Sequence, residues 1–181
     1  MIIRELETDR LILRKLNKDD IKPLWDNFFN DYDKYKFYDD YKINSYEELS
    51  EKLTKQIENY DKGECFKWAI VEKESNELIG NINLHHYDEA NNNIKLGYFI
   101  FDIYRNKGYV TEAVLAVINF TFKEAKIHRI TASAISTNEA SNRVLIKTGF
   151  LLEGTKNEDS RIDGKYYDSN IYGLINNLWS S

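Results

Sequence analysis

The stretch of sequence that decides the fold is residues 99–113, FIFDIYRNKGYVTEA. An apolar run enters a short loop with Arg, Lys and Gly, and this loop opens a long helical pattern. The first N–H groups of a helix lack intrahelical acceptors and lie at the positive end of its dipole, so they bind anions. Gly108 would let a ligand approach the backbone, while Arg105 and Lys107 add positive charge. An anion-binding turn is therefore expected, although an ordinary strand-to-helix turn with a solvated basic pair fits the same residues.

Hydrophobic periodicity around this stretch predicts a run of strands and helices. The acidic pair Asp19-Asp20 precedes the first helical pattern, and Ser45 with Glu48 forms a capping-box pattern before the second. The elements predict an α+β domain, with a central twisted mixed sheet of about seven strands flanked by about four helices. The expected strands are 10–16, 66–71, 78–84, 94–101, 129–135, 150–155 and 166–174, and the expected helices are 21–28, 45–57, 110–121 and 139–147.

The composition indicates one folded domain, expected to span residues 1–181. The chain has 25 Lys+Arg against 30 Asp+Glu, a net charge of −5, so the basic patch typical of nucleic-acid binding is not expected. The single cysteine, Cys65, makes no intramolecular disulfide, which favours a cytoplasmic location. The longest uncharged apolar stretch, Ala113–Phe122, is about half of the roughly 20 residues that span a bilayer, and no signal-peptide pattern opens the chain. We expect a soluble protein that binds neither nucleic acid nor membrane.

Several motifs that carry other chemistries do not occur. The sequence contains no P-loop, no G-x-G-x-x-G dinucleotide fingerprint and no G-x-S-x-G nucleophile elbow. His85 and His86 with Cys65 do not make a metal site, because no further ligand appears at suitable spacing. Neither a metal nor covalent catalysis is expected.

The loop of residues 105–110 resembles the pyrophosphate-binding motif of the GNAT N-acetyltransferases, which has the form [QR]-x-x-G-x-[GA]. Arg105, Gly108 and Val110 occupy its three defining positions. Val110 departs from the pattern, because Gly or Ala is usual there. In this family the backbone amides of the motif hold the pyrophosphate of acetyl-CoA.

Further segments extend the resemblance to about residues 9–175. Residues 138–150 match the family's N-x-x-[AS]…G-F segment, and residues 80–85 and 96–98 match the strands before the pyrophosphate loop. Asp168 precedes a closing apolar strand, as in the subgroup that resembles ribosomal-protein N-terminal alanine and serine acetyltransferases. The resemblance implies a GNAT-like fold, in which a splayed pair of parallel strands holds acetyl-CoA.

Acetyl-CoA is the cosubstrate that the resemblance implies, with no metal. The splayed strands would be 96–101 and 129–135, with main-chain contacts to the pantetheine from Phe99 and Ile100. For the side chains of Phe99 and Ile100, the alternative is core packing. Asn138 could instead be the N-cap of its helix, and Lys147 could be a solvated surface residue. The implied cofactor contacts are Phe99, Ile100, Phe101, Arg105, Asn106, Lys107, Gly108, Tyr109, Val110, Thr111, Asn138, Asn142 and Lys147.

Direct acetyl transfer needs a proton or a hydrogen bond for the departing thiolate. Many family members use a Tyr seven residues after the Asn for this task, but that position here is Leu145. The subgroup with ribosomal-protein substrates has a Ser three residues after the Asn, and Ser141 fills that place. Ser141 is thus the expected hydrogen-bond donor, with a plain helix-surface serine as the alternative.

The general base is expected to be His85, because histidine has an ordinary pKa near 6.5. His86 is expected on the opposite face, since neighbours in a strand alternate. The alternatives are a structural His85, an ordered water, or the carboxylates of Asp168 and Glu153. Asp168 could equally hold a loop through backbone N–H groups.

The acceptor is expected to contact residues 31–41, DYDKYKFYDDY, which mix aromatic and acidic side chains. Such a mixture suits a cationic amine, although an aromatic packing loop with solvated acids fits as well. The expected substrate contacts are Tyr35, Tyr38, Asp39 and Tyr98.

The resemblance implies an acetyl-CoA-dependent N-acetyltransferase that acts on a primary amine, foremost the α-amine of a protein or peptide N-terminus. A small polyamine or aminoglycoside acceptor is one alternative, and a non-catalytic CoA-binding or sensor domain is another. The resemblance suggests a monomer or a homodimer.

The charge of the chain is unevenly distributed. Residues 1–93 carry 14 basic and 21 acidic side chains, whereas residues 94–181 carry 11 and 9. Within 102–149, seven basic residues stand against four acidic ones. The first region suits a cationic acceptor and the second an anionic cofactor.

Overall fold

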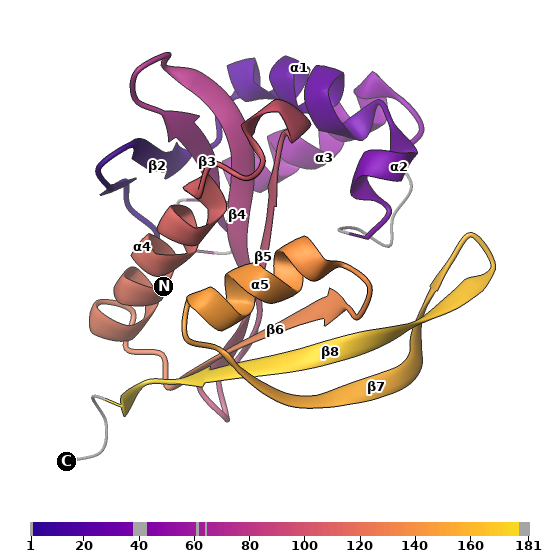
Figure 1. Ribbon diagram of the computed structural model, residues 1–181. Helices are drawn as coiled ribbons and strands as arrows, with labels where there is room; N and C mark the ends of the chain where they lie inside the picture. The colour runs from indigo at the N-terminus through magenta and orange to yellow at the C-terminus, as the bar shows by residue number, and fades with distance from the viewer. Residues whose placement is uncertain (1, 38–42, 61, 64, 178–181) are drawn as a thin grey trace. The chain divides into compact units, whose positions relative to one another are not determined.

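The computed structural model describes residues 2–37, 43–60, 62–63 and 65–177. Its strands are β1 Leu6–Glu7, β2 Leu11–Lys15, β3 Phe66–Glu72, β4 Glu77–Asp88, β5 Asn93–Ile100, β6 Arg129–Ile135, β7 Leu151–Ile162 and β8 Lys165–Ile175 (Figure 1). Its α-helices are α1 Ile21–Leu24, α2 Tyr32–Tyr35, α3 Tyr46–Glu58, α4 Tyr109–Lys123 and α5 Glu139–Lys147. A π-helical turn, Trp25–Phe29, continues α1, and 3-10 turns lie at Lys18–Asp20 and Asp102–Tyr104.

The eight described strands form one sheet in the order β1-β2-β3-β4-β5-β6-β8-β7, which confirms the expected α+β class. The sequence patterns missed β1 and the short helix α2. The chain divides into two compact units, Met1–Asn83 with Tyr98–Ala116, and Leu84–Gly97 with Val117–Ser181. Strands β4 and β5 and helix α4 contribute residues to both units. One domain over residues 1–181 stays a prediction.

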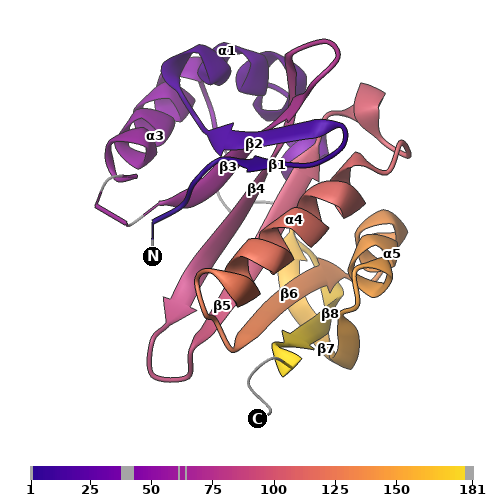
Figure 2. The same ribbon diagram turned by 90° about the vertical axis from the view of Figure 1, so that its left-hand side faces the viewer.

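In the first unit, the antiparallel strands β1, β2 and β3 carry much of the apolar core (Figure 2). Leu11 and Leu13 of β2 are fully buried while Ile12 between them is half-buried, so the strand shows the predicted alternation. Trp68 of β3 is also fully buried, and its indole N–H donates to the carbonyl of Arg4 at 2.8 Å. Burial of this ring fixes the N-terminal segment on the sheet.

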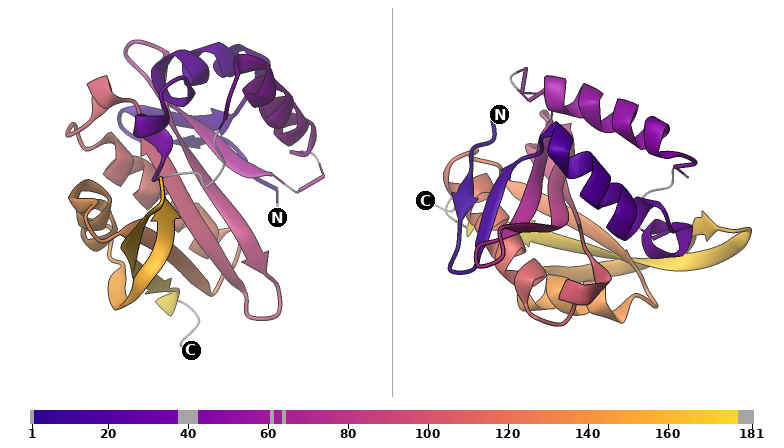
Figure 3. Two further views of the ribbon diagram at one scale, coloured as in Figure 1. Left: turned by 90° about the vertical axis from the view of Figure 1, so that its right-hand side faces the viewer. Right: turned by 90° about the horizontal axis from the view of Figure 1, so that it is seen from above.

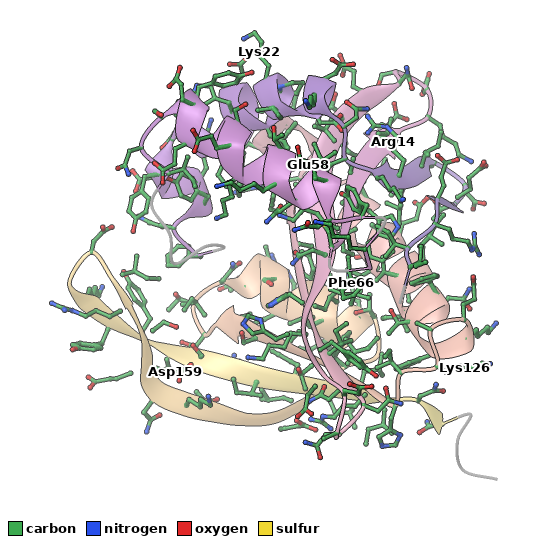
Figure 4. All side chains as sticks on the ribbon, turned by 180° about the vertical axis from the view of Figure 1, so that it is seen from behind. Arg14, Lys22, Glu58, Phe66, Lys126 and Asp159 are labelled. Carbon is green, nitrogen blue, oxygen red and sulfur yellow. The ribbon has the colours of Figure 1, made fainter. Side chains whose placement is uncertain are left out.

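The predicted Ser45 cap is present at the start of α3, whereas the Asn17 cap before the first helical segment was not predicted. Asn17 and Asp20 form a capping box, and the buried Asp20 also takes two hydrogen bonds from Arg14, at 2.7 and 2.8 Å. Ser45 accepts from the N–H of Glu48 at the start of α3. α3 contacts α1, and Figure 3 shows them side by side. Figure 4 labels Glu58 at the end of α3 and Arg14 on β2.

In the second unit, β6 and β8 pair antiparallel from Arg129 opposite Ile175 to Ile135 opposite Ser169. β7 pairs with β8 on its other side, and its register shifts between Leu152 and Gly154 and again between Lys156 and Ser160. Asp159, labelled in Figure 4, lies in the second irregular stretch. β7 continues to Ile162, well past the predicted end of this strand at residue 155. α5 contacts β6 and β7.

The predicted parallel pair is present between β5 and β6. Its register runs from Asn93 opposite Arg129 to Lys95 opposite Thr131, at the start of both strands. Among the described residues, no helix combines the length and the apolar content that crossing a membrane requires.

Candidate active site

The loop between β5 and α4 has the backbone geometry of an anion-binding turn. Two of its residues adopt left-handed backbone, Asn106 with a φ of 61° and Gly108 with a φ of 82°. The first helical hydrogen bond runs from the N–H of Glu112 to the carbonyl of Gly108 at 3.1 Å. Within the described part of the chain, the N–H groups of residues 106–111 donate to no protein acceptor. Six consecutive backbone donors are thus available at the positive end of the α4 dipole.

The two cations of this loop have partners within it. Arg105 pairs with Asp102 at 2.8 Å, and the ammonium of Lys107 lies 5.2 Å from the centre of the Tyr104 ring. The hydroxyl of Tyr104 donates to the carboxylate of Glu77, and this hydrogen bond raises the pKa of Tyr104 to about 12. Arg105 and Lys107 remain exposed, so both can add positive charge for an anion.

Arg10 is a contact of this loop that the sequence did not reveal. Its guanidinium donates to the carboxylate of Glu112 at 2.7 Å and to the carbonyl of Lys107 at 2.9 Å, and it lies 4.6 Å from the centre of the Tyr109 ring. Thr8 donates to the same carboxylate at 2.6 Å. No local pattern could show these contacts, because 97 residues separate Arg10 from Lys107.

The strand before the loop approaches β4 closely. A Cβ at Gly80 would lie 2.4 Å from the carbonyl oxygen of Phe99, and the N–H of Phe101 donates to the carbonyl of Ile79 at 2.8 Å. Backbone groups alternate along a strand, so those of Ile100 point to the other edge. This geometry favours the predicted main-chain contact for Ile100 and disfavours it for Phe99. Both side chains are buried, which agrees with core packing.

Helix α5 begins at Asn138, which caps it by accepting from the N–H of Ser141 at 3.2 Å. This confirms the N-cap alternative for Asn138. Ser141 is half-buried in the first turn. Leu145, at the position where many GNAT proteins have Tyr, is buried in the core. Ser141 is therefore the hydroxyl that this helix offers near its N-terminus.

Asn142 has a structural role in the described protein, and its predicted cofactor contact stays a prediction. Its amide nitrogen donates to the carbonyls of Ile135 and Asn138 at 3.1 and 2.7 Å. Its amide oxygen accepts from Tyr172 at 2.6 Å and from Asn170 at 2.9 Å. Both ends of the buried amide are occupied, so it fastens α5 to β6 and β8.

The two carboxylates considered as bases are also engaged. Asp168 accepts from the N–H of Glu158 at 2.8 Å, where Glu158 has a φ of 51° in the irregular part of β7. Asp168 thus holds a loop, as the alternative for it predicted. Glu153 forms an ion pair with Arg129. Neither geometry favours a role as the base.

The expectation that His85 and His86 face opposite sides of the strand is wrong. Their Nδ1 atoms lie 2.5 Å apart, and their rings meet edge to face. The cause is the left-handed backbone of His86, with a φ of 50°, which breaks the alternation of β4. One ring must donate a proton and the other accept it.

The comparisons with known proteins decide the family. The model of the acetyltransferase (GNAT) domain matches residues 10–151. The chain belongs to the GNAT acetyltransferase family. It is 31% identical to YoaA of Bacillus subtilis (strain 168), an uncharacterized N-acetyltransferase, over 94% of this chain and 96% of that protein. It is 28% identical to the ribosomal-protein-serine acetyltransferase of Escherichia coli (strain K12), over 60% of this chain and 61% of that protein.

The fold agrees with this assignment. The structure of RimL, a ribosomal alpha-N-protein acetyltransferase in complex with coenzyme A, matches with a TM-score of 0.86 and 20% identity. The match covers 95% of this chain and 98% of that one. This GNAT protein is therefore an acetyl-CoA-dependent N-acetyltransferase.

Three further residues that the resemblance implies as cofactor contacts are half-buried or exposed. Val110 and Thr111 are half-buried in the first turn of α4, and Lys147 is exposed at the end of α5. Among the described residues, no group of three or more His, Cys, Asp or Glu side chains is placed to hold a metal ion. Cofactor contacts by these residues stay predictions.

The predicted acceptor residues of this GNAT protein differ in their surroundings. Tyr35 is fully buried, and its hydroxyl donates to the carbonyl of Ile43 at 3.1 Å and accepts from its N–H at 2.9 Å. Contact between Tyr35 and an acceptor would therefore require this segment to move. Tyr98 of β5 is half-buried. Tyr38 and Asp39 lie outside the described residues.

Proposed function

We propose that this GNAT enzyme transfers the acetyl group of acetyl-CoA directly to the α-amine of a protein or peptide N-terminus. The observation that carries the proposal is the start of α5, where Ser141 offers a hydroxyl and Leu145 is buried in the core. This is the pattern of the subgroup with ribosomal-protein substrates. RimL, a ribosomal alpha-N-protein acetyltransferase, and the ribosomal-protein-serine acetyltransferase of E. coli support the same acceptor class.

The loop before α4 is the proposed pyrophosphate site. Backbone N–H groups from Asn106 to Thr111 donate to the phosphate oxygens. The positive charges of Arg105 and Lys107 attract the phosphates without a directed hydrogen bond. The backbone of Ile100 pairs with an amide of the pantetheine. Asn138 contacts the same arm through the hydrogen-bonding groups of its side chain that the cap of α5 does not use.

Acetyl-CoA supplies a thioester, whose carbonyl carbon the neutral amine attacks. The new N–C bond forms, the C–S bond breaks, and the amine gives up one proton. Ser141 donates a hydrogen bond to the sulfur as negative charge develops there. His85 takes the proton from the amine, which its Nε2 can accept in the tautomer in which its Nδ1–H donates to His86.

The proton balance favours an α-amine over a polyamine. An α-amine has an ordinary pKa near 7.7 to 8.0, whereas a side-chain primary amine has one near 10.4. Near neutral pH the neutral, attacking form is therefore roughly 300-fold more abundant for an α-amine than for a side-chain amine. A polyamine can bind in its charged form, but its turnover near neutral pH is limited by this small neutral fraction.

The test measures thiol release from acetyl-CoA with a panel of acceptors. Peptides with a free N-terminal Ser or Ala should turn over, and mass spectrometry should place the acetyl group on the α-amine. The matched control is the same peptide with its N-terminus already acetylated and one internal Lys, which should not react. Turnover of polyamines or of the internal Lys alone would contradict the acceptor class. Binding of acetyl-CoA without turnover of any acceptor would instead indicate a non-catalytic domain.

A further inference from the structure

Arg10 makes a dense set of contacts with the proposed pyrophosphate loop. Its Nη1 donates to the carbonyl of Lys107 at 2.9 Å, and its Nε donates to Glu112 at 2.7 Å. Its backbone N–H donates to the same carboxylate at 2.9 Å, and its guanidinium stacks on the ring of Tyr109. A Cβ at Gly108 would lie 3.4 Å from Nη2. One side chain thus touches residues on both sides of the loop glycine.

The contact with Lys107 fixes the direction of one backbone donor. The peptide bond between Lys107 and Gly108 is planar and trans, so its C=O and N–H point in opposite directions. Because the carbonyl points at Arg10, the N–H of Gly108 must point away from it. That N–H belongs to the set of donors with no protein acceptor. Gly108 has no Cβ to restrict its φ, so without Arg10 the peptide between Lys107 and Gly108 is free to rotate.

The contact with Glu112 controls a negative charge beside the same donors. Glu112 lies in the first turn of α4, where a loose carboxylate would repel phosphate and compete for the free N–H groups. Burial raises the pKa of Glu112, but the hydrogen bonds from Thr8 and Arg10 outweigh burial and lower it. The carboxylate is therefore ionised at neutral pH and is held on the side of Arg10.

We infer that Arg10 is a positioning residue for phosphate recognition, which directs the Gly108 N–H toward the pyrophosphate and holds Glu112 away from it. It touches no reacting atom. A guanidinium is needed, because a lysine ammonium cannot bond Lys107 and Glu112 in a planar fork while stacking on Tyr109. The inference rests on the proposed role of the loop in binding acetyl-CoA.

The test compares two ligands, CoA and S-acetylpantetheine, which lacks the pyrophosphate. For Arg10→Lys, the Kd of CoA should rise about tenfold, the worth of one charge-assisted hydrogen bond. The Kd of S-acetylpantetheine should not change. The matched control is Lys73→Ala, which removes a cation that contacts Glu7 and the carbonyl of Thr8 but not the loop. It should leave both Kd values unchanged.

A second readout follows the donor itself. Inorganic pyrophosphate should shift the ¹⁵N–¹H amide resonance of Gly108 in the wild type, and this shift should shrink in Arg10→Lys. Circular dichroism confirms that each variant is folded, and the NMR readout requires only the conservative variant.

The outcomes separate the inference from the proposed function. An equal loss for CoA and S-acetylpantetheine, or no loss for either in folded Arg10→Lys, would overturn the role of Arg10. If the wild type binds CoA but the Gly108 resonance does not respond to pyrophosphate, the proposed phosphate role of the loop fails as well.

Discussion

The rings of Phe28 and Phe99 stack face to face, with centroids 3.8 Å apart and an angle of 5° between their planes. Phe29 meets Phe99 edge-on at 5.8 Å, so two successive residues of the π-helical turn contact one ring. Through Phe99, the helical segment after β2 is packed on the strand that leads into the proposed pyrophosphate loop.

Loss of this stacking should destabilise the fold. Phe28→Ala removes a buried ring and should cost about 3 to 5 kcal/mol in the free energy of unfolding. The matched control is Phe37→Ala, whose ring is 43% exposed and which should cost about 0.5 kcal/mol. Urea unfolding monitored by circular dichroism measures both values. If the two variants were equally stable, the stacking would contribute nothing.

Gly108 and Gly164 offer a matched pair of left-handed glycines, with φ of 82° and 78°. Replacing either by Ala should cost about 1 to 2 kcal/mol of stability through backbone strain. At Gly108 the new methyl group also meets Arg10, whereas no described atom lies within 4 Å at Gly164. Calorimetry should therefore find weaker CoA binding in Gly108→Ala only. The same loss of affinity in Gly164→Ala would show that it follows from strain anywhere in the fold.

Helices and strands could be predicted from the sequence where one hydrophobic periodicity repeats over enough residues. The bounds of β6 and α5 agree with the expectation to the residue, because each shows one clear apolar period between polar ends. β1 has two residues and α2 has four, too few for any period to show. β7 was cut short because its irregular register near Glu158 breaks the alternation.

The site was predictable only where chemistry is local in the chain. The proposed pyrophosphate loop has its glycine, its cations and its helix start within ten residues, so the motif could be recognised. Arg10 could not, since its partner Glu112 lies 102 residues away. The structural role of Asn142 depends on Tyr172 and Asn170 of β8, and the contact of His85 with His86 depends on one positive φ.

Asn142→Ala separates a structural role from cofactor binding. The change leaves the buried hydroxyl of Tyr172 and the carbonyl of Ile135 without this partner, so stability should fall by about 3 kcal/mol. The Kd for CoA of the folded protein should stay within twofold. Chemical unfolding and calorimetry give the two numbers. A large loss of CoA affinity at unchanged stability would support the predicted cofactor contact.

The contribution of Glu112 to the stability of the fold should be lost at acid pH. Its pKa is lowered below the ordinary value of 4.5, and a carboxyl group with a lowered pKa stabilises the fold above its unfolded pKa. That stabilisation is lost as pH falls through the folded pKa. The difference in Tm between the wild type and Glu112→Gln should therefore be constant from pH 7 to about 5 and narrow below about 4.5.

Thermal melts at pH 7, 5, 4 and 3 measure this difference. Glu139→Gln is the control, because Glu139 is an exposed residue of α5 and its only described ion pair is with Arg143. This variant should change Tm little at any pH. A difference for Glu112→Gln that persists undiminished at pH 3 would mean that its charge does not stabilise the fold.

Ser141→Ala tests the proposed hydrogen bond to the departing sulfur. A thiol has an ordinary pKa near 8.5, so its thiolate needs most help when the pH is below that value. We expect kcat to fall about tenfold or more at pH 7, and the defect to shrink as the pH approaches 9. Ser141→Thr keeps a hydroxyl and should recover much of the rate. Asn138→Ala loses the cap of α5 at a cost of about 1 kcal/mol and also the proposed pantetheine contact, so its kcat at saturating acetyl-CoA gives an upper bound on the effect of loosening the helix. If Ser141→Ala keeps full kcat across this pH range, the sulfur receives its hydrogen bond from another group.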